Sequence, residues 1–129
     1  MRVRIAALVL LLALVPSAAG ALPFKAKLTA ATHTPTINTK WRYSVRVTNL
    51  KGQAITAKVT VQIVDPLGGV HPVEYGCCAK KFVTNVRIKG RFRDWVQYPL
   101  AAKGYRITFK VTVKTARGTR VVTYWIKTI

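Results

Sequence analysis

The sequence predicts an all-β domain, and three observations support this fold class. Apolar and polar residues alternate with a period of two along four long segments, as in strands buried on one face. Clusters of Gly, Asn, Asp and Pro, which favour tight turns, separate these segments. After residue 21, no stretch shows the repeat of about 3.6 residues that marks an amphipathic helix. We therefore expect a β-sandwich of about seven antiparallel strands.

The first element, residues 1–21, has the pattern of a secretory signal peptide. Arg2 and Arg4 precede an apolar run over residues 5–15, and small residues follow up to Ala21. We expect cleavage after Ala21 and a secreted or extracytoplasmic domain. The alternative is an uncleaved membrane anchor, since no charged residue lies between Arg4 and Lys25.

Residues 22–129 are expected to form one sandwich domain. Its strands are predicted at residues 24–32, 41–48, 55–63, 80–88, 91–97, 105–114 and 120–127. In the second of these, four apolar side chains share one face and alternate with polar ones. Because Trp41, Tyr43 and Phe109 are in phase with valines and isoleucines, we expect these aromatic rings in the core.

One strand-turn-strand stretch carries a resemblance to a known class of domain. It consists of an aromatic-x-Val-x-Val strand with an Asn-x-x-Gly turn over residues 41–52, and a second alternating strand over residues 55–59. This stretch resembles bacterial secreted immunoglobulin-like sandwich domains. The resemblance implies an immunoglobulin-like sandwich with an adhesion, envelope or scaffolding role. The chain departs from antibody-type domains, because its two cysteines, Cys77 and Cys78, are adjacent.

The charge is strongly one-sided, with 22 Lys and Arg against the three acids Asp65, Glu74 and Asp94. Removal of Arg2 and Arg4 leaves 20 cations against three acids, a formal charge of +17. Such a domain attracts polyanions over a Debye length of ~8 Å. We expect an anionic envelope polymer or a membrane surface as partner, with a protein partner left open. An exported domain is not expected to read specific nucleic acid, and no small-molecule substrate is indicated.

The cations are expected on the outer faces of both sheets, because they alternate with apolar residues. The candidates for polyanion contact are Arg42, Arg46, Lys58, Arg91, Arg93, Arg106, Lys110 and Lys114. Charge spread over two faces suits loose attraction of a polyanion better than a shaped pocket. The plainer alternative is a basic surface that serves solubility alone.

Residues 68–78 form the segment that could carry chemistry. It is expected to be a loop and holds His71, Glu74, Cys77 and Cys78, which together could bind zinc or copper, with His33 as a further ligand. Their spacing matches no structural zinc signature, however. The plainer interpretation of both histidines is that they are ordinary loop or turn residues.

The adjacent cysteines have three possible fates after export. A vicinal disulfide between Cys77 and Cys78 would be strained, because neighbouring Cα atoms lie closer together than the ~4.4–6.8 Å typical of disulfides. Free or intermolecularly paired thiols and metal ligation are the alternatives.

The sequence argues against an enzyme. It lacks paired carboxylates for acid–base catalysis, a Gly-rich phosphate loop and the common hydrolase motifs. The leading hypothesis is a non-catalytic extracytoplasmic binding or structural module that contacts the anionic envelope through basic sheet faces. The alternative is a metal-binding or thiol-redox-responsive module that uses the segment from His71 to Cys78.

Overall fold

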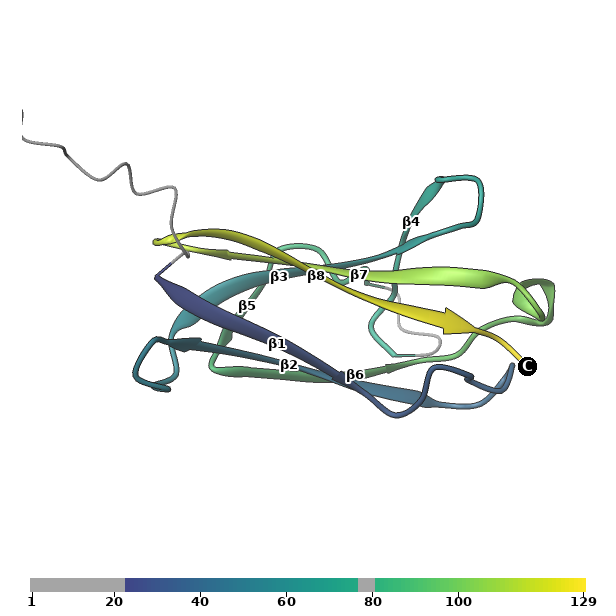
Figure 1. Cartoon of the computed structure of the whole chain (residues 1–129), viewed down its shortest axis with the longest axis horizontal. Coiled ribbons are helices and arrows are strands. Elements are labelled where there is room, and N and C mark those ends of the chain that lie inside the picture. Colours follow the sequence, from purple (N-terminus) through teal and green to yellow (C-terminus); the bar gives the residue numbers. More distant parts are fainter. Residues whose placement is uncertain (1–22, 77–80) are drawn as a thin grey trace, which may run out of the picture.

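The computed structural model describes residues 23–76 and 81–129, and its strands form two antiparallel sheets packed face to face (Figure 1). The smaller sheet has the order β1 (Phe24–Ala30), β2 (Trp41–Asn49), β6 (Arg91–Val96). The larger has the order β4 (Val70–Pro72), β3 (Thr56–Val64), β7 (Arg106–Thr115), β8 (Gly118–Lys127), and β5 (Val86–Lys89) also pairs with β3. A 3-10 turn, η1 (Leu100–Ala102), precedes β7. The predicted all-β sandwich is confirmed.

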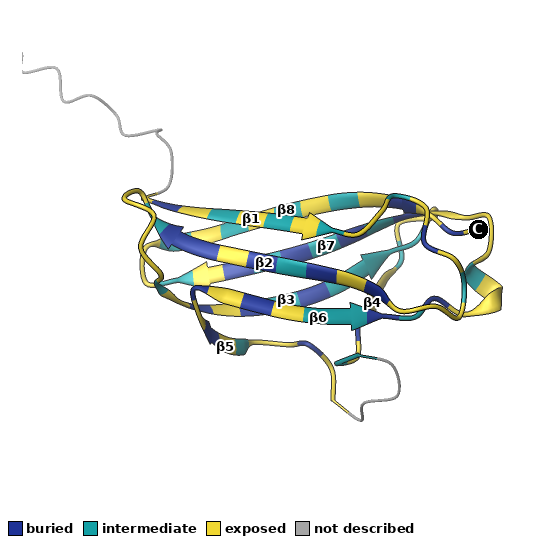
Figure 2. Ribbon diagram, turned by 90° about the horizontal axis from the view of Figure 1, so that it is seen from below, coloured by how far each residue is buried: buried dark blue, intermediate teal, exposed yellow. Residues whose placement is uncertain are grey.

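The core lies between the sheets and is built by the alternation seen in the sequence. Figure 2 shows it as buried and exposed bands along each strand. Phe109 of β7 is fully buried, and its ring centroid lies 5.0 Å from that of Trp41 and 4.7 Å from that of Tyr43 on β2. The three aromatic side chains therefore lie in the core, as predicted. Burial of each such side chain favours folding by roughly 1.5–3 kcal/mol.

Two predicted elements differ from the structure. The strand expected at residues 80–88 is confined to Val86–Lys89, and the segment expected to be a loop contains the short strand β4. The backbone of Asn85 is left-handed, with φ of 50°, so the extended chain is interrupted just before β5. The amide of Asn85 donates to the Thr60 hydroxyl at 3.0 Å, which holds this interruption against β3.

The connection between β1 and β2 is bound to the end of the chain. The amides of Lys127 and Ile129 donate to the carbonyls of His33 and Pro35 at 2.8 and 3.0 Å. The His33 ring stacks on both Tyr124 and Trp125, with ring centroids 4.0 Å apart in each case. His33 is thus a half-buried side chain packed on β8.

The two ends of the sandwich differ in their connections. One end carries the β2–β3, β5–β6 and β7–β8 turns and the start of β1, and the other carries the β3–β4 turn, η1 and the C-terminus (Figure 1). Within residues 23–76 and 81–129, no helix is long and apolar enough to cross a membrane.

Candidate anion-binding surface

The strand register places like charges directly opposite one another. Such pairs occur in both sheets: Lys27–Arg46, Arg46–Arg91, Lys58–Arg87, Lys58–Lys114 and Arg106–Lys127. Directly opposed like charges destabilise a sheet. The first four pairs join into two rows of three cations. Lys27–Arg46–Arg91 crosses the smaller sheet, and Arg87–Lys58–Lys114 crosses the larger one.

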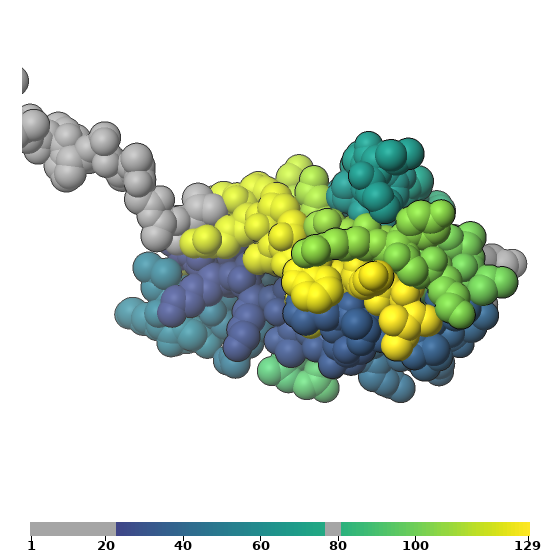
Figure 3. Space-filling model, turned by 45° about the vertical axis from the view of Figure 1, so that its right-hand side comes forward, coloured from purple at the N-terminus to yellow at the C-terminus, as the bar shows by residue number. Residues whose placement is uncertain are grey.

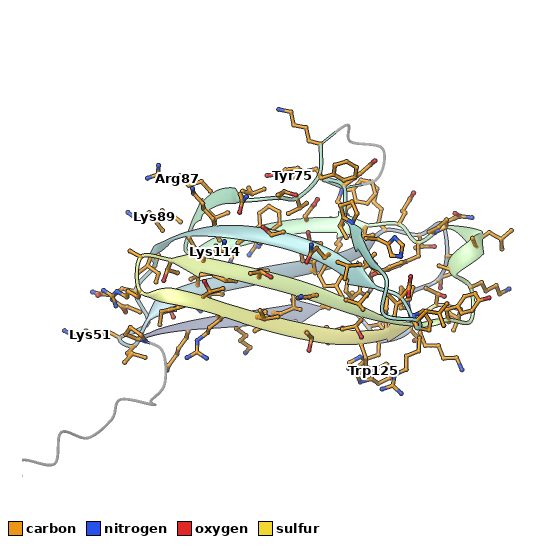
Figure 4. The ribbon with its side chains drawn as sticks, turned by 90° about the horizontal axis from the view of Figure 1, so that it is seen from above. Lys51, Tyr75, Arg87, Lys89, Lys114 and Trp125 are labelled. Atoms are coloured by element: carbon orange, nitrogen blue, oxygen red, sulfur yellow. The ribbon has the colours of Figure 1, made fainter. Side chains whose placement is uncertain are left out.

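Both rows lie toward the end that carries the β2–β3 turn, and turn residues add further cations there. Figure 4 shows Lys51, Arg87, Lys89 and Lys114 toward this end of the molecule. We call this surface the basic pole. It consists of Lys27, Arg46, Lys51, Lys58, Arg87, Lys89, Arg91, Lys114 and Arg117, all of which are exposed. In the part of the chain that the structure describes, none of them forms an ion pair with a carboxylate.

Two of the three acids are engaged elsewhere. The Asp94 carboxylate, on the inner side of β6, accepts hydrogen bonds from the Gly76 amide at 3.0 Å and the Tyr43 hydroxyl at 3.4 Å. Burial, together with the negative charge of Asp94, raises the pKa of Tyr43 well above its ordinary value. Asp65 accepts hydrogen bonds within the β3–β4 turn. These two carboxylates therefore do not neutralise the positive charge of the cation rows.

A groove of about 630 Å³ runs over the outer face of the smaller sheet, next to its cation row. Thr29, Ser44 and Arg93 stand in one cross-strand row, and Arg42 opposes Trp95 in the next. Ala30, Ala31, Tyr43 and Asp94 complete the lining. Ser44 thus neighbours both arginines, and Thr29 adds a second hydroxyl group beside it. Guanidinium and hydroxyl donors suit the oxygens of a phosphate or carboxylate.

The larger sheet has a smaller groove beside its own cation row. It measures about 320 Å³ and is lined by Thr56, Ala57, Lys58, Arg87, Lys114, Thr115 and Ala116. Its lining combines three cations with hydroxyl groups, as the groove on the smaller sheet also combines cations and hydroxyls. Each outer face therefore offers a shallow, open surface that is rich in hydrogen-bond donors.

The structure places seven of the eight predicted contact residues on exposed positions, and Lys110 is half-buried. Arg106 belongs to the opposite end of the sandwich, where its guanidinium lies 4.8 Å from the centre of the Trp125 ring. Five cations join the surface although the sequence did not single them out: Lys27, Lys51, Arg87, Lys89 and Arg117. The alternation of Lys27 with Ala26 and Leu28 in the sequence could have placed Lys27 on an outer face. Arg87 and Lys89 fall where the predicted strand was misplaced.

The described part of the chain includes three of the predicted metal ligands, His33, His71 and Glu74. Among the described residues, no three His, Cys, Asp or Glu side chains are grouped as a metal site would require. His71 Nε2 lies 2.7 Å from Asp65 Oδ2. Asp65 is not one of the predicted metal ligands. Glu74 is exposed, and its backbone forms an isolated antiparallel bridge with Phe82. Cys77 and Cys78 lie outside the described residues.

His33 is separated from His71 by the width of the larger sheet. It packs on β8, whereas His71 belongs to β4 at the opposite edge. Zinc or copper binding and a vicinal disulfide stay predictions. Elemental analysis and thiol titration of the protein from its native compartment test them.

A short hairpin leads the chain to and from residues 77–80. Its arms pair through Val83 and Val73 at 2.7 Å and through Tyr75 and Lys81 at 2.8 Å. The Tyr75 ring packs edge-on against Phe92, with ring centroids 5.9 Å apart. Gly76, with φ of 54°, passes so close to Trp95 that a Cβ atom there would lie 3.0 Å from the indole ring. The hairpin thus covers the free edge of β6 beside Asp94.

The chain matches no model of a known protein family. A search of curated proteins likewise found no match.

Proposed function

We propose that this protein is a non-catalytic extracytoplasmic binding or structural module that holds an anionic envelope polymer at its basic pole. The observation that carries the proposal is the pair of in-register cation rows. Each opposed pair costs a fraction of a kcal/mol, roughly 0.2–1. A polyanion bound along the rows relieves this repulsion. Binding therefore recovers the free energy that the opposed cations cost the unbound domain.

The arrangement favours a polymer over a small anion. The rows Lys27–Arg46–Arg91 and Arg87–Lys58–Lys114 lie on opposite outer faces of the sandwich, whose sheets stand roughly 10 Å apart. A small ligand reaches one row at a time. A chain with repeated phosphates or carboxylates can contact both, and linked contacts raise the overall affinity.

The strand order supports an immunoglobulin-like module of the kind that the sequence resembles. Strands β1, β2 and β6 in one sheet, with β3, β7 and β8 in the other, parallel the division of strands in such sandwiches. The position of β5, on the larger sheet beside β3, departs from that pattern. A scaffold of this kind is compatible with envelope binding but does not itself specify it.

A salt-dependent pull-down tests the proposal. The wild-type protein is mixed with purified cell walls, intact or stripped of anionic polymers, over a series of NaCl concentrations. We expect binding to intact walls that weakens as salt rises, and little binding to stripped walls. No binding to intact walls at low salt overturns the proposal.

Two triple variants with the same change in net charge locate the surface. Lys58→Gln, Arg87→Gln and Lys114→Gln remove the row on the larger sheet, while Lys103→Gln, Lys110→Gln and Lys127→Gln remove three cations outside the basic pole. The first variant should lose most wall binding and the second should keep most of it. Equal losses would show that net charge alone attracts the walls.

A further inference from the structure

The end opposite the basic pole exposes several apolar side chains. Leu67 in the β3–β4 turn is 98% exposed, Leu100 in η1 is 67% exposed and Tyr105 is 57% exposed. Pro66 and Ala101, also exposed, lie next to them in the chain. We call these five residues the apolar pole. Contiguous exposed apolar surface on a small protein marks a binding surface for a protein or a membrane.

The turn that presents Leu67 is held by several hydrogen bonds. The Asp65 carboxylate accepts from the amides of Leu67 at 2.9 Å and Gly69 at 2.8 Å, and its other oxygen lies 2.7 Å from His71 Nε2. The backbone closes the turn between Asp65 and Gly69 at 2.8 Å, and Gly68 supplies a φ of 86°. Leu67 is therefore fixed outward at the apex, which reduces the entropy that it loses on binding.

An apolar groove connects the turn to the segment around η1. It has a volume of about 500 Å³ and is lined by Asp65, Pro66, Leu67, Ala101, Tyr105 and Ile107. Figure 3 shows the β3–β4 hairpin projecting from the body beside this segment. The two parts of the apolar pole thus form one surface.

Cations border this surface. Lys103 follows η1, and Arg106 at the start of β7 stands opposite Lys127. All three are exposed. Asp65 is the acid nearest the apex, and the two turn amides and His71 surround its carboxylate. Apolar side chains rimmed by lysine and arginine complement the acyl and headgroup layers of an anionic lipid surface.

We propose that the apolar pole inserts into the interface of an anionic lipid bilayer, with Leu67 and Leu100 entering the apolar layer and Lys103, Arg106 and Lys127 meeting the headgroups. Tyr105 suits the boundary between them, because its ring is apolar and its hydroxyl is polar. This activity goes beyond polymer binding and uses the other end of the molecule. Together, the two ends would link an envelope polymer to a membrane.

Flotation with lipid vesicles tests the proposal on the wild-type protein. Vesicles contain phosphatidylcholine alone or equal parts of phosphatidylcholine and phosphatidylglycerol. We expect the protein to float with the mixed vesicles and to remain largely bound at about 0.5 M NaCl, where charge attraction between exposed groups is screened. Vesicles of phosphatidylcholine alone should bind it less.

A leucine at the other end provides a matched control. Leu67→Ser with Leu100→Ser should lower the partition onto mixed vesicles about a hundredfold, because each inserted leucine favours binding by roughly an order of magnitude. Leu50→Ser, at a leucine 58% exposed in the β2–β3 turn, should leave partition unchanged. All three leucines are exposed, and a thermal melt checks that the variants fold like the wild type.

Three results overturn the lipid proposal. They are absence of wild-type flotation, complete release of the protein by salt, and equal partition of the wild type and the double leucine variant. Release by salt would assign vesicle binding to the cations alone. The wall pull-down separates this outcome from the polymer proposal, because the double leucine variant should bind walls as the wild type does.

Discussion

The two poles are built at opposite ends of the same strands but by different means. The basic pole is made mainly by register, because Arg46 and Lys58 each meet a cation on both neighbouring strands. The apolar pole is made by a turn, in which Asp65 holds Leu67 outward. Strand pairing thus concentrates charge without a loop, whereas Leu67 is presented to solvent by a turn that local hydrogen bonds hold. Four predictions test whether the poles are independent surfaces on a common core.

The largest effect is expected from the core that both poles share. Phe109→Ala removes a fully buried ring that packs on Trp41 and Tyr43. We expect the free energy of unfolding, measured by urea titration, to fall by about 3–5 kcal/mol. Val121→Ala, at an exposed valine on the outer face of β8, should change it by less than about 0.5 kcal/mol. A loss at Phe109 below about 1 kcal/mol would contradict the assigned core.

A smaller effect is expected at Asp94, between the poles. Asp94→Ala leaves the Gly76 amide and the Tyr43 hydroxyl without their shared acceptor. We expect the free energy of unfolding to fall by about 1–3 kcal/mol. Asp94→Asn retains a carbonyl oxygen and should cost less. Vesicle binding by both folded variants should match the wild type, and a loss would show that the apolar pole is coupled to this region.

The sequence predicted the sheets better than it predicted the surfaces on them. Alternation is local, so it placed Phe109 inside and Arg46 outside without knowledge of strand partners. The cation rows depend on register, which joins residues as distant as Lys58 and Lys114 and cannot be read from either strand alone. The misplaced strand at residues 80–88 has a similar cause, because the left-handed backbone at Asn85 is supported by Thr60 on another strand.

The same limit applies to the segment from His71 to Cys78. The sequence predicts His71 as a ligand beside Glu74, but the pairing of β3 with β4 brings His71 to Asp65 instead. In the sequence, Asp65 indicated only the end of a strand. Asp65 presents Leu67 by accepting hydrogen bonds from the amides of Leu67 and Gly69. These contacts depend on the folded conformation of the turn, which the sequence pattern does not specify.

Acid should loosen the apolar pole before it affects the basic pole. The hydrogen bond with His71 and those from the Gly69 and Leu67 amides lower the pKa of Asp65. A carboxyl with a lowered pKa stabilises the folded turn above its ordinary pKa of about 4, and this contribution is lost as the pH falls through the lowered value. Amide hydrogen exchange at Leu67 and Gly69 should therefore accelerate, relative to the intrinsic rate, as the pH falls below about 4.

Asp65→Asn provides the comparison for this pH dependence. The variant should exchange faster than the wild type at neutral pH and should show no further loosening in acid. Amides of β3 opposite Lys114 should keep their protection throughout. If the wild-type turn exchanged at the same relative rate on both sides of pH 4, the carboxylate would not be what holds Leu67 outward.

The smallest effect should have opposite signs for folding and for binding. Lys58 faces Arg87 on one side and Lys114 on the other, so Lys58→Gln removes two repulsive contacts. We expect the free energy of unfolding at low salt to rise by about 0.2–1 kcal/mol, and this gain to vanish near 0.5 M NaCl. Wall binding should fall in the same variant. Lys103→Gln, which removes a cation outside the strands, should change neither quantity appreciably.

A destabilised Lys58→Gln variant would mean that the lysine contributes to the fold through packing of its alkyl chain. A stabilised variant with weaker wall binding would show that the basic pole keeps its opposed charges at the expense of stability, as expected of a surface that serves binding.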